Sequence, residues 1–83
     1  MMKKDVITLV PVSSSPQWTA IDVSATALNG IDVGDPVSFN PVGQTGVNLA
    51  TYGMITAYVS ALNEITFGYR LLSQSVDLIV WTP

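Results

Sequence analysis

Turn-forming residues interrupt this chain about every 8–15 residues, and that spacing limits what the chain can fold into. Between the interruptions, apolar residues often alternate with polar ones, which is the period of a half-buried β-strand. In residues 21–26 the alternation places Ile21, Val23 and Ala25 on one face and Asp22, Ser24 and Thr26 on the other. The best helical candidate, residues 47–52, is too short to support a helix. The pattern therefore predicts an all-β protein.

Six strands are expected, over residues 6–12, 18–26, 37–40, 54–61, 64–70 and 76–82. Loops at 13–16, 41–53 and 71–75 separate them, together with turns at Asn29-Gly30 and at residues 32–35. The loop at 41–53 is long enough to be functional or to be held by a neighbouring molecule. Six short strands in 83 residues predict one β domain over residues 1–83, built as a small six-stranded antiparallel barrel or a compact sandwich.

The small size of the chain points to a partner. A domain of this length buries only about 60% of the surface that its unfolded chain exposes, and small domains often need extra stabilisation. The chain has no cysteine for disulfides and no histidine, so oligomerisation or docking remains. Charged residues make up only 11% of the chain, against about 25% in typical domains. Faces covered by neighbours explain that low charge better than a monomer with an uncharged β surface.

The charge balance excludes other partners. A net charge of −3 and only three basic residues, Lys3, Lys4 and Arg70, leave no basic stripe for nucleic acid. No run approaches the roughly 20 apolar residues of a membrane-spanning helix. Residues 5–11 are too short and interrupted for the apolar core of a signal peptide. We therefore expect no nucleic acid, no membrane, and synthesis in a cytoplasm.

Catalytic chemistry lacks its usual residues here. Without cysteine or histidine there is no Ser-His-Asp or Cys-His arrangement and no histidine-based zinc site. Asp32 and Asp35 are the nearest acidic pair and are candidates for acid–base work or a calcium site. Because they flank Gly34, turn capping is the simpler interpretation. We expect no enzyme activity, no catalytic residue, no metal and no cofactor.

Interface residues are expected on the later strands. Residues 78–81 are continuously apolar, which predicts a strand covered on both faces, by the core and by another subunit. Asp77 stands inside that apolar strand and needs a partner, and Arg70 is a candidate for a salt bridge to Asp77 or Glu64 of a neighbouring copy. The first and sixth strands are expected at sheet edges, open to strand addition. The predicted interface comprises Trp18, Tyr58, Arg70, Asp77, Leu78, Val80 and Trp81.

The chain also resembles a group of small phage virion proteins over residues 31–81. The resemblance rests on the segments Val33-Gly34-Asp35-Pro36-Val37, Ala57-Tyr58-Val59-Ser60-Ala61, Asn63-Glu64-Ile65-Thr66-Phe67 and Ser75-Val76-Asp77. In those proteins a Gly-Asp turn leads into a strand, a hairpin of this form follows, and the end carries Val-Asp. The chain lacks the Asn near positions 71–72 and the Pro-rich step after Asp77 that the pattern carries.

The resemblance implies a non-enzymatic bacteriophage structural protein: a capsid decoration (cement) subunit, or a small spike or fibre base. Such a subunit stabilises the shell through contacts with the major capsid protein or other virion proteins. It would lie on the capsid surface in many copies, often as a trimeric homo-oligomer. The alternative is a carbohydrate-binding or host-attachment module of a spike or fibre. That alternative predicts an exposed cluster of aromatic residues, drawn from Trp18, Tyr52, Tyr58, Tyr69 and Trp81.

Overall fold

The computed structural model describes residues 2–10, 17–42, 55–70 and 75–83. They form six strands: β1 (Lys3–Leu9), β2 (Gln17–Asp22), β3 (Ser38–Pro41), β4 (Thr56–Ala61), β5 (Glu64–Tyr69) and β6 (Val76–Thr82). No helix occurs in these described ranges, so the all-β prediction is confirmed. The loop at 13–16, the candidate helix at 47–52 and most of the loops at 41–53 and 71–75 lie outside them.

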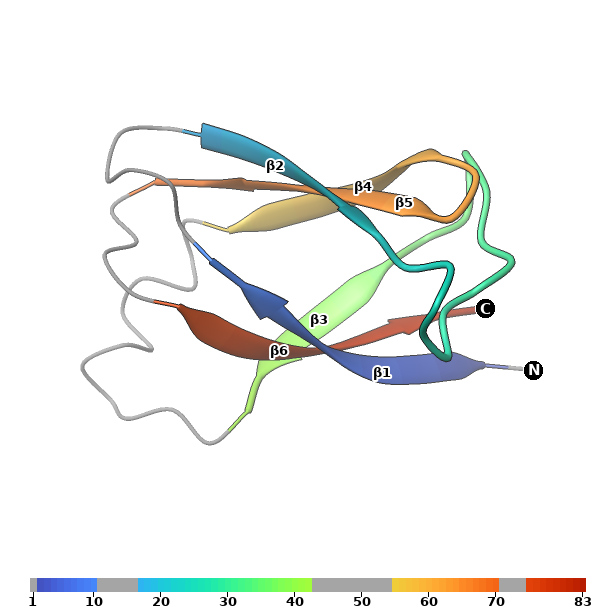
Figure 1. The fold of residues 1–83 in the computed structure, drawn as a ribbon, viewed down its shortest axis with the longest axis horizontal. Coiled ribbons are helices and arrows are strands. Elements are labelled where there is room, and N and C mark those ends of the chain that lie inside the picture. The colour runs from blue at the N-terminus through green and yellow to red at the C-terminus, as the bar shows by residue number, and fades with distance from the viewer. Residues whose placement is uncertain (1, 11–16, 43–54, 71–74) are drawn as a thin grey trace.

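Two three-stranded antiparallel sheets face each other (Figure 1). Their strand orders are β1-β6-β3 and β2-β5-β4, so of the two predicted architectures the compact sandwich fits. β6 is the central strand of its sheet, hydrogen-bonded to β1 on one side and to β3 on the other. The expectation that the sixth strand is a sheet edge is therefore wrong, whereas β1 does lie at an edge.

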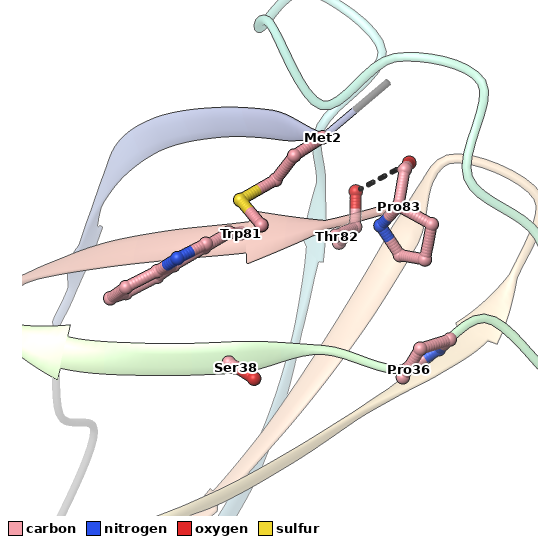
Figure 2. A pocket seen from close by; sticks show the side chains of 6 residues that line it. All are labelled: Met2, Pro36, Ser38, Trp81, Thr82 and Pro83. Atoms are coloured by element: carbon pink, nitrogen blue, oxygen red, sulfur yellow. Dashed lines mark hydrogen bonds between the residues drawn. The ribbon is translucent and has the colours of Figure 1, made fainter.

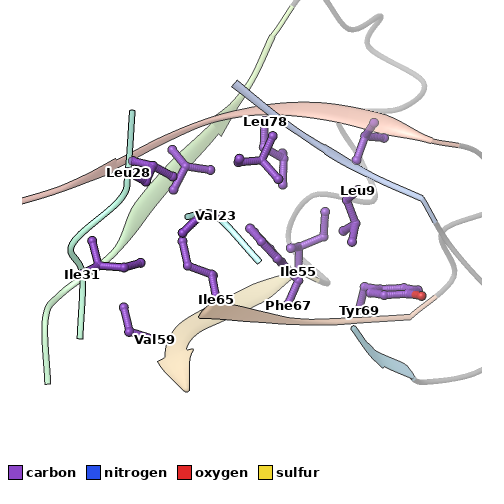
Figure 3. Packing of buried hydrophobic residues seen from close by; sticks show 13 residues of the cluster. Leu9, Val23, Leu28, Ile31, Ile55, Val59, Ile65, Phe67, Tyr69 and Leu78 are labelled. Carbon is purple, nitrogen blue, oxygen red and sulfur yellow. The ribbon is translucent and has the colours of Figure 1, made fainter. Parts of the chain in front are cut away.

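The core lies between the two central strands (Figure 3). β5 contributes Ile65, Phe67 and Tyr69, and β6 contributes alternate residues that are almost completely buried. Phe67 meets Phe39 of β3 edge to face, with ring centroids 6.2 Å apart, which joins the two sheets. The buried hydrophobic set is Ile7, Leu9, Val23, Leu28, Ile31, Ile55, Val59, Ile65, Phe67, Tyr69, Val76, Leu78 and Val80.

Two strand boundaries differ from the predicted ones because hydrogen bonds, and not the alternation of apolar residues, determine where these strands begin and end. β1 begins at Lys3 because it pairs with β6 from Lys3 opposite Thr82 onwards. β2 ends at Asp22, whose carboxylate accepts the backbone N–H of Ser24 at 2.8 Å and starts a turn. Ala25 is consequently exposed rather than directed to the core, as its place in the alternation had predicted.

The connection between β2 and β3 closes one end of the core. It carries Val23, Leu28 and Ile31, all completely buried, although they belong to no strand. The edge strand β1 fixes this connection, because the carboxylate of Asp5 accepts the backbone N–H of Ala27 at 2.9 Å. The connection therefore supplies core volume that three short strands per sheet would leave empty.

Asn63 joins this connection to the β4–β5 hairpin. Its backbone φ is +60°, in the left-handed region that asparagine tolerates better than most residues. Its backbone N–H donates to the carbonyl of Ile31 at 2.9 Å, and its own carbonyl accepts the N–H of Val23 at 2.9 Å. Its side-chain oxygen accepts the N–H of Gly30 at 2.6 Å. One residue thus satisfies three backbone groups of the connection.

Substitution of Asn63 should separate the conformational role of this residue from its hydrogen bond. Asn63→Gly tolerates the positive φ but loses the bond to Gly30, whereas Asn63→Ala loses the bond and is strained as well. We expect unfolding free energies, measured by urea denaturation, in the order wild type, Gly, Ala, with the Ala variant about 1–3 kcal/mol below wild type. Equal stability of the Gly and Ala variants would contradict the conformational part of this account.

Acid should weaken the fold partly through Asp5. The N–H groups of Ala27 and then Val6 donate to this carboxylate and lower its pKa below the ordinary value of 3.8. A carboxylate whose pKa is lower in the folded protein than in the unfolded chain stabilises the folded state at pH values above the pKa of the unfolded chain. That stabilisation is lost as the pH falls through the pKa of the folded protein. Asp22 has a lowered pKa for the same reason, through Ser24.

We therefore expect the unfolding free energy of Asp5→Asn to fall less steeply than that of wild type between about pH 5 and pH 2. Asp5→Asn/Asp22→Asn should show the smallest pH dependence of the three proteins. Denaturant titrations at a series of pH values measure these slopes. Parallel profiles for Asp5→Asn and wild type would rule out the bond to Ala27 as a source of the acid sensitivity.

Candidate functional site

Each sheet turns one side to the core and the other side outward, which gives the sandwich two candidate binding surfaces. We call the outward side of the β2-β5-β4 sheet the β5 face. Its residues are Trp18, Ala20, Asp22, Thr56, Tyr58, Ser60, Glu64, Thr66 and Gly68. We call the outward side of the β1-β6-β3 sheet the β6 face. Its residues are Lys4, Val6, Thr8, Ser38, Asn40, Asp77, Ile79 and Trp81.

The β5 face carries two exposed aromatic side chains on either side of its central strand. Trp18 of β2 is 63% exposed and Tyr58 of β4 is 52% exposed. Their rings meet edge to face, with centroids 6.1 Å apart and an interplanar angle of 73°. Trp18 is paired with Gly68, and a Cβ atom at Gly68 would come within 2.7 Å of three indole carbons. The indole thus lies directly over the bare backbone of Gly68, which is buried beneath it.

A chain of polar side chains continues the β5 face away from the rings. The hydroxyl of Thr66 donates to the hydroxyl oxygen of Ser60 at 2.7 Å. The hydroxyl of Ser60 donates to Oε1 of Glu64, also at 2.7 Å. These two hydrogen bonds hold Oε1 of Glu64 in one position and keep its side chain close to the sheet.

The β6 face has an apolar centre. Val6, which is 48% exposed, pairs with the half-buried Ile79, and Trp81 follows two residues later on the same strand. Lys4 stands beside Trp81 at one end, and at the other end the hydroxyl of Thr8 donates to Oδ1 of Asp77 at 2.7 Å. The face therefore has an apolar middle with a positive and a negative group at opposite ends.

A hollow of about 350 Å³ opens beside Trp81, at the end of the sandwich where both chain termini lie (Figures 1 and 2). Met2, which is 65% exposed, extends over this hollow next to Trp81 (Figure 2). Apolar groups dominate the walls, so the hollow extends the apolar centre of the β6 face. Its lining consists of Met2, Pro36, Ser38, Trp81, Thr82 and Pro83.

The predicted interface residues fall into three places. Trp18 and Tyr58 lie together on the β5 face, Asp77 and Trp81 lie on the β6 face, and Arg70 is exposed just beyond the end of β5. Leu78 and Val80, by contrast, are completely buried in the core of this chain. Neither lies on the surface, so their assignment as contacts to another subunit is corrected.

The apolar run in β6 has two different explanations. Leu78 and Val80 fill the core, whereas the outward residues Ile79 and Trp81 remain partly exposed. Asp77 is exposed and already accepts the hydroxyl of Thr8, so the expectation of a buried carboxylate that requires a partner is also wrong. Period-two alternation explains both corrections, because Asp77 and the outward apolar residues share one face.

Asp32 and Asp35 are used by the turn that they flank. The carboxylate of Asp32 accepts the N–H of Val33 at 2.7 Å, and that of Asp35 accepts the N–H of Asp32 at 2.9 Å. Gly34 completes the turn with a φ of +99°. In the part of the chain that the structure describes, no group of three or more acidic, cysteine or histidine side chains is placed to hold a metal ion.

Comparisons with protein families, with curated proteins and with solved structures found no match to this chain. The helix that would be needed to cross a membrane is also not found among the described residues. The two faces must therefore be interpreted from their own residues.

Gly68 is the functional-site residue that sequence reasoning missed. A single glycine inside a strand pattern often marks a place where another group approaches the backbone closely. Gly68 stands two residues after Thr66 on the polar side of the predicted strand at 64–70, so this signal was present. Only the pairing of β2 with β5 identifies the approaching group as Trp18.

Gly68→Ala should displace the indole without removing it. The added methyl group would occupy the space of the Trp18 ring, and the ring, being exposed on its far side, can move outward. We expect weaker nuclear Overhauser effects between the rings of Trp18 and Tyr58, with the fold retained. Thr56→Ala, at the exposed position on the other side of Gly68, is the matched control and should leave them unchanged. Unchanged contacts in Gly68→Ala would mean that the indole does not rest on this backbone.

Proposed function

We propose that this protein is a non-enzymatic structural subunit that works in many copies and associates with other copies of itself through the β6 face. The observation that carries the proposal is the apolar centre of that face, formed by Val6, Ile79 and Trp81 on the outside of a sandwich that already has a complete core. The setting we propose is the surface of a bacteriophage capsid, as a decoration or cement subunit next to the major capsid protein. The resemblance to small phage virion proteins supports that setting.

The arrangement of the β6 face supports association with a protein rather than with a solute. Protein interfaces have an apolar, well-packed centre and a polar rim. Here the rim includes Lys4, Asp77 and the neighbouring hydroxyl of Thr8. A standard interface buries about 800 Å² on each partner, which is about a sixth of the 4731 Å² surface of this chain. For a small domain, burial on that scale contributes strongly to stability.

The charges of the face support a second copy as the partner. Lys4 and Asp77 lie on neighbouring strands about 13 Å apart along the strand direction, because four residues separate Asp77 from the Trp81 that pairs with Lys4. Two copies that meet antiparallel would bring each Lys4 near the partner's Asp77, as a two-fold interface requires. A closed trimer, which the resemblance implies, would use the same apolar centre with a different symmetry.

Light scattering of the purified protein tests the proposal. We expect wild type to have a mass of at least twice the 8.8 kDa of one chain at micromolar concentration. Val6→Glu places a charge in the centre of the face, at a position exposed enough to leave the subunit folded, and should reduce the mass to that of one chain. Val33→Glu makes the same change on the exposed 32–35 turn, outside the face, and should behave as wild type does. A wild-type protein that stays monomeric up to millimolar concentration would overturn the proposal.

A further inference from the structure

The β5 face is on the opposite side of the sandwich from the proposed docking surface, and its residues suggest a separate task. We propose that it binds a neutral oligosaccharide, with one sugar ring stacked on the indole of Trp18 and the hydroxyl groups of a further unit held by Glu64. This proposal is independent of the proposed self-association, because the two faces share no residue.

The indole of Trp18 is held as a platform. One side of the ring rests on Gly68, its contact with Tyr58 limits tilting, and the side chain is still 63% exposed. The negative face of an aromatic ring attracts weakly positive C–H groups, which a pyranose presents on its flat sides. Because the ring is fixed before binding, a ligand that stacks on it loses little additional side-chain entropy.

The exposure of Trp18 is not explained by a role in shielding the backbone of Gly68 alone. A tryptophan placed only to shield the backbone would be expected to bury most of its own surface, yet both aromatic side chains remain more than half exposed. Thr66, in the middle of the face, is flanked by Tyr58 on one side and by the small Ala20 on the other. The two rings therefore border a shallow floor formed by Ala20 and the buried Thr66.

The polar groups occupy the other end of that floor. The bond from Ser60 positions Oε1 of Glu64, and a carboxylate has further lone pairs that can accept hydroxyl groups of a ligand. Glu64 is four residues from Gly68 on β5, so about 13 Å along the strand separates it from the pair of Gly68 and Trp18. One sugar ring cannot cover both ends, so the face fits an oligosaccharide better than a monosaccharide.

The charges favour a neutral ligand. The nine residues of the β5 face include two acids, Asp22 and Glu64, and no basic residue. Carboxylates repel phosphates and acidic sugars but accept hydrogen bonds from hydroxyl groups. Arg70 lies just beyond the end of β5, at the end of the face where Trp18 pairs with Gly68. Because this arginine could attract an acidic sugar, an acidic oligosaccharide is tested as a separate probe.

Titration of ¹⁵N-labelled protein with cellohexaose, chitohexaose and mannohexaose, followed by NMR, tests the proposal. We expect at least one of the three to shift resonances of β2, β4 and β5, with glucose or mannose binding more weakly than the hexasaccharide. Trp18→Ala should weaken binding about tenfold, as expected for the loss of one aromatic contact. Trp81→Phe changes the other tryptophan, on the opposite face, and should bind as wild type does.

Two further variants keep the test clear if Trp18→Ala disturbs the fold. Gly68→Ala moves the indole without deleting it, and Glu64→Gln keeps one acceptor oxygen but removes the charge. Both should weaken binding while the spectrum of the folded protein is retained. The proposal is overturned if none of the three neutral hexasaccharides binds at millimolar concentration. It is also overturned if hexagalacturonate binds more tightly than they do, or if Trp18→Ala and Trp81→Phe bind equally well.

Discussion

The structure depends on one constraint: the six strands of the described residues enclose a single core between only two sheets, so each sheet turns one side inward and the other outward. The central strands β5 and β6 provide six of the thirteen buried hydrophobic residues of the described core, and the buried connection residues Val23, Leu28 and Ile31 close one end. On the outward sides, Ile79 and Trp81 of β6 remain partly exposed. Thr66 and Gly68 of β5 are buried, and the exposed side chains of Trp18 and Tyr58 stand on the edge strands beside them. The character of those two outward sides then decides what the protein can bind.

Asn63 shows how local geometry maintains this arrangement. The β4–β5 hairpin turns at a residue with a positive φ, and the same residue satisfies backbone groups of Val23, Gly30 and Ile31. The hairpin therefore fixes the connection that leads from one sheet into the other. That single turn therefore joins the β4–β5 hairpin to the connection that closes one end of the core.

Turn-forming residues and the alternation between them predicted the class of the fold and the six strands that the described residues form. For residues 76–82, a continuous apolar run predicted the bounds of the strand. Strand order was not predictable in this way, because it depends on pairing between distant residues. The sixth strand was expected at an edge but is central, and Leu78 and Val80 were expected at an interface but fill the core. Trp18 and Tyr58 were each singled out from the sequence, whereas their meeting over Gly68 required the pairing of β2, β4 and β5.

We propose that the two outer faces perform different tasks, and the two tryptophans of the chain report on them separately, since Trp18 lies on the β5 face and Trp81 on the β6 face. Incorporation of 5-fluorotryptophan gives one ¹⁹F resonance for each, assigned with Trp81→Phe. We expect dilution to shift only the Trp81 resonance, and the bound hexasaccharide to shift only the Trp18 resonance. Movement of both resonances in both titrations, or a Trp81 resonance that does not change on dilution, would show that the two faces do not act separately.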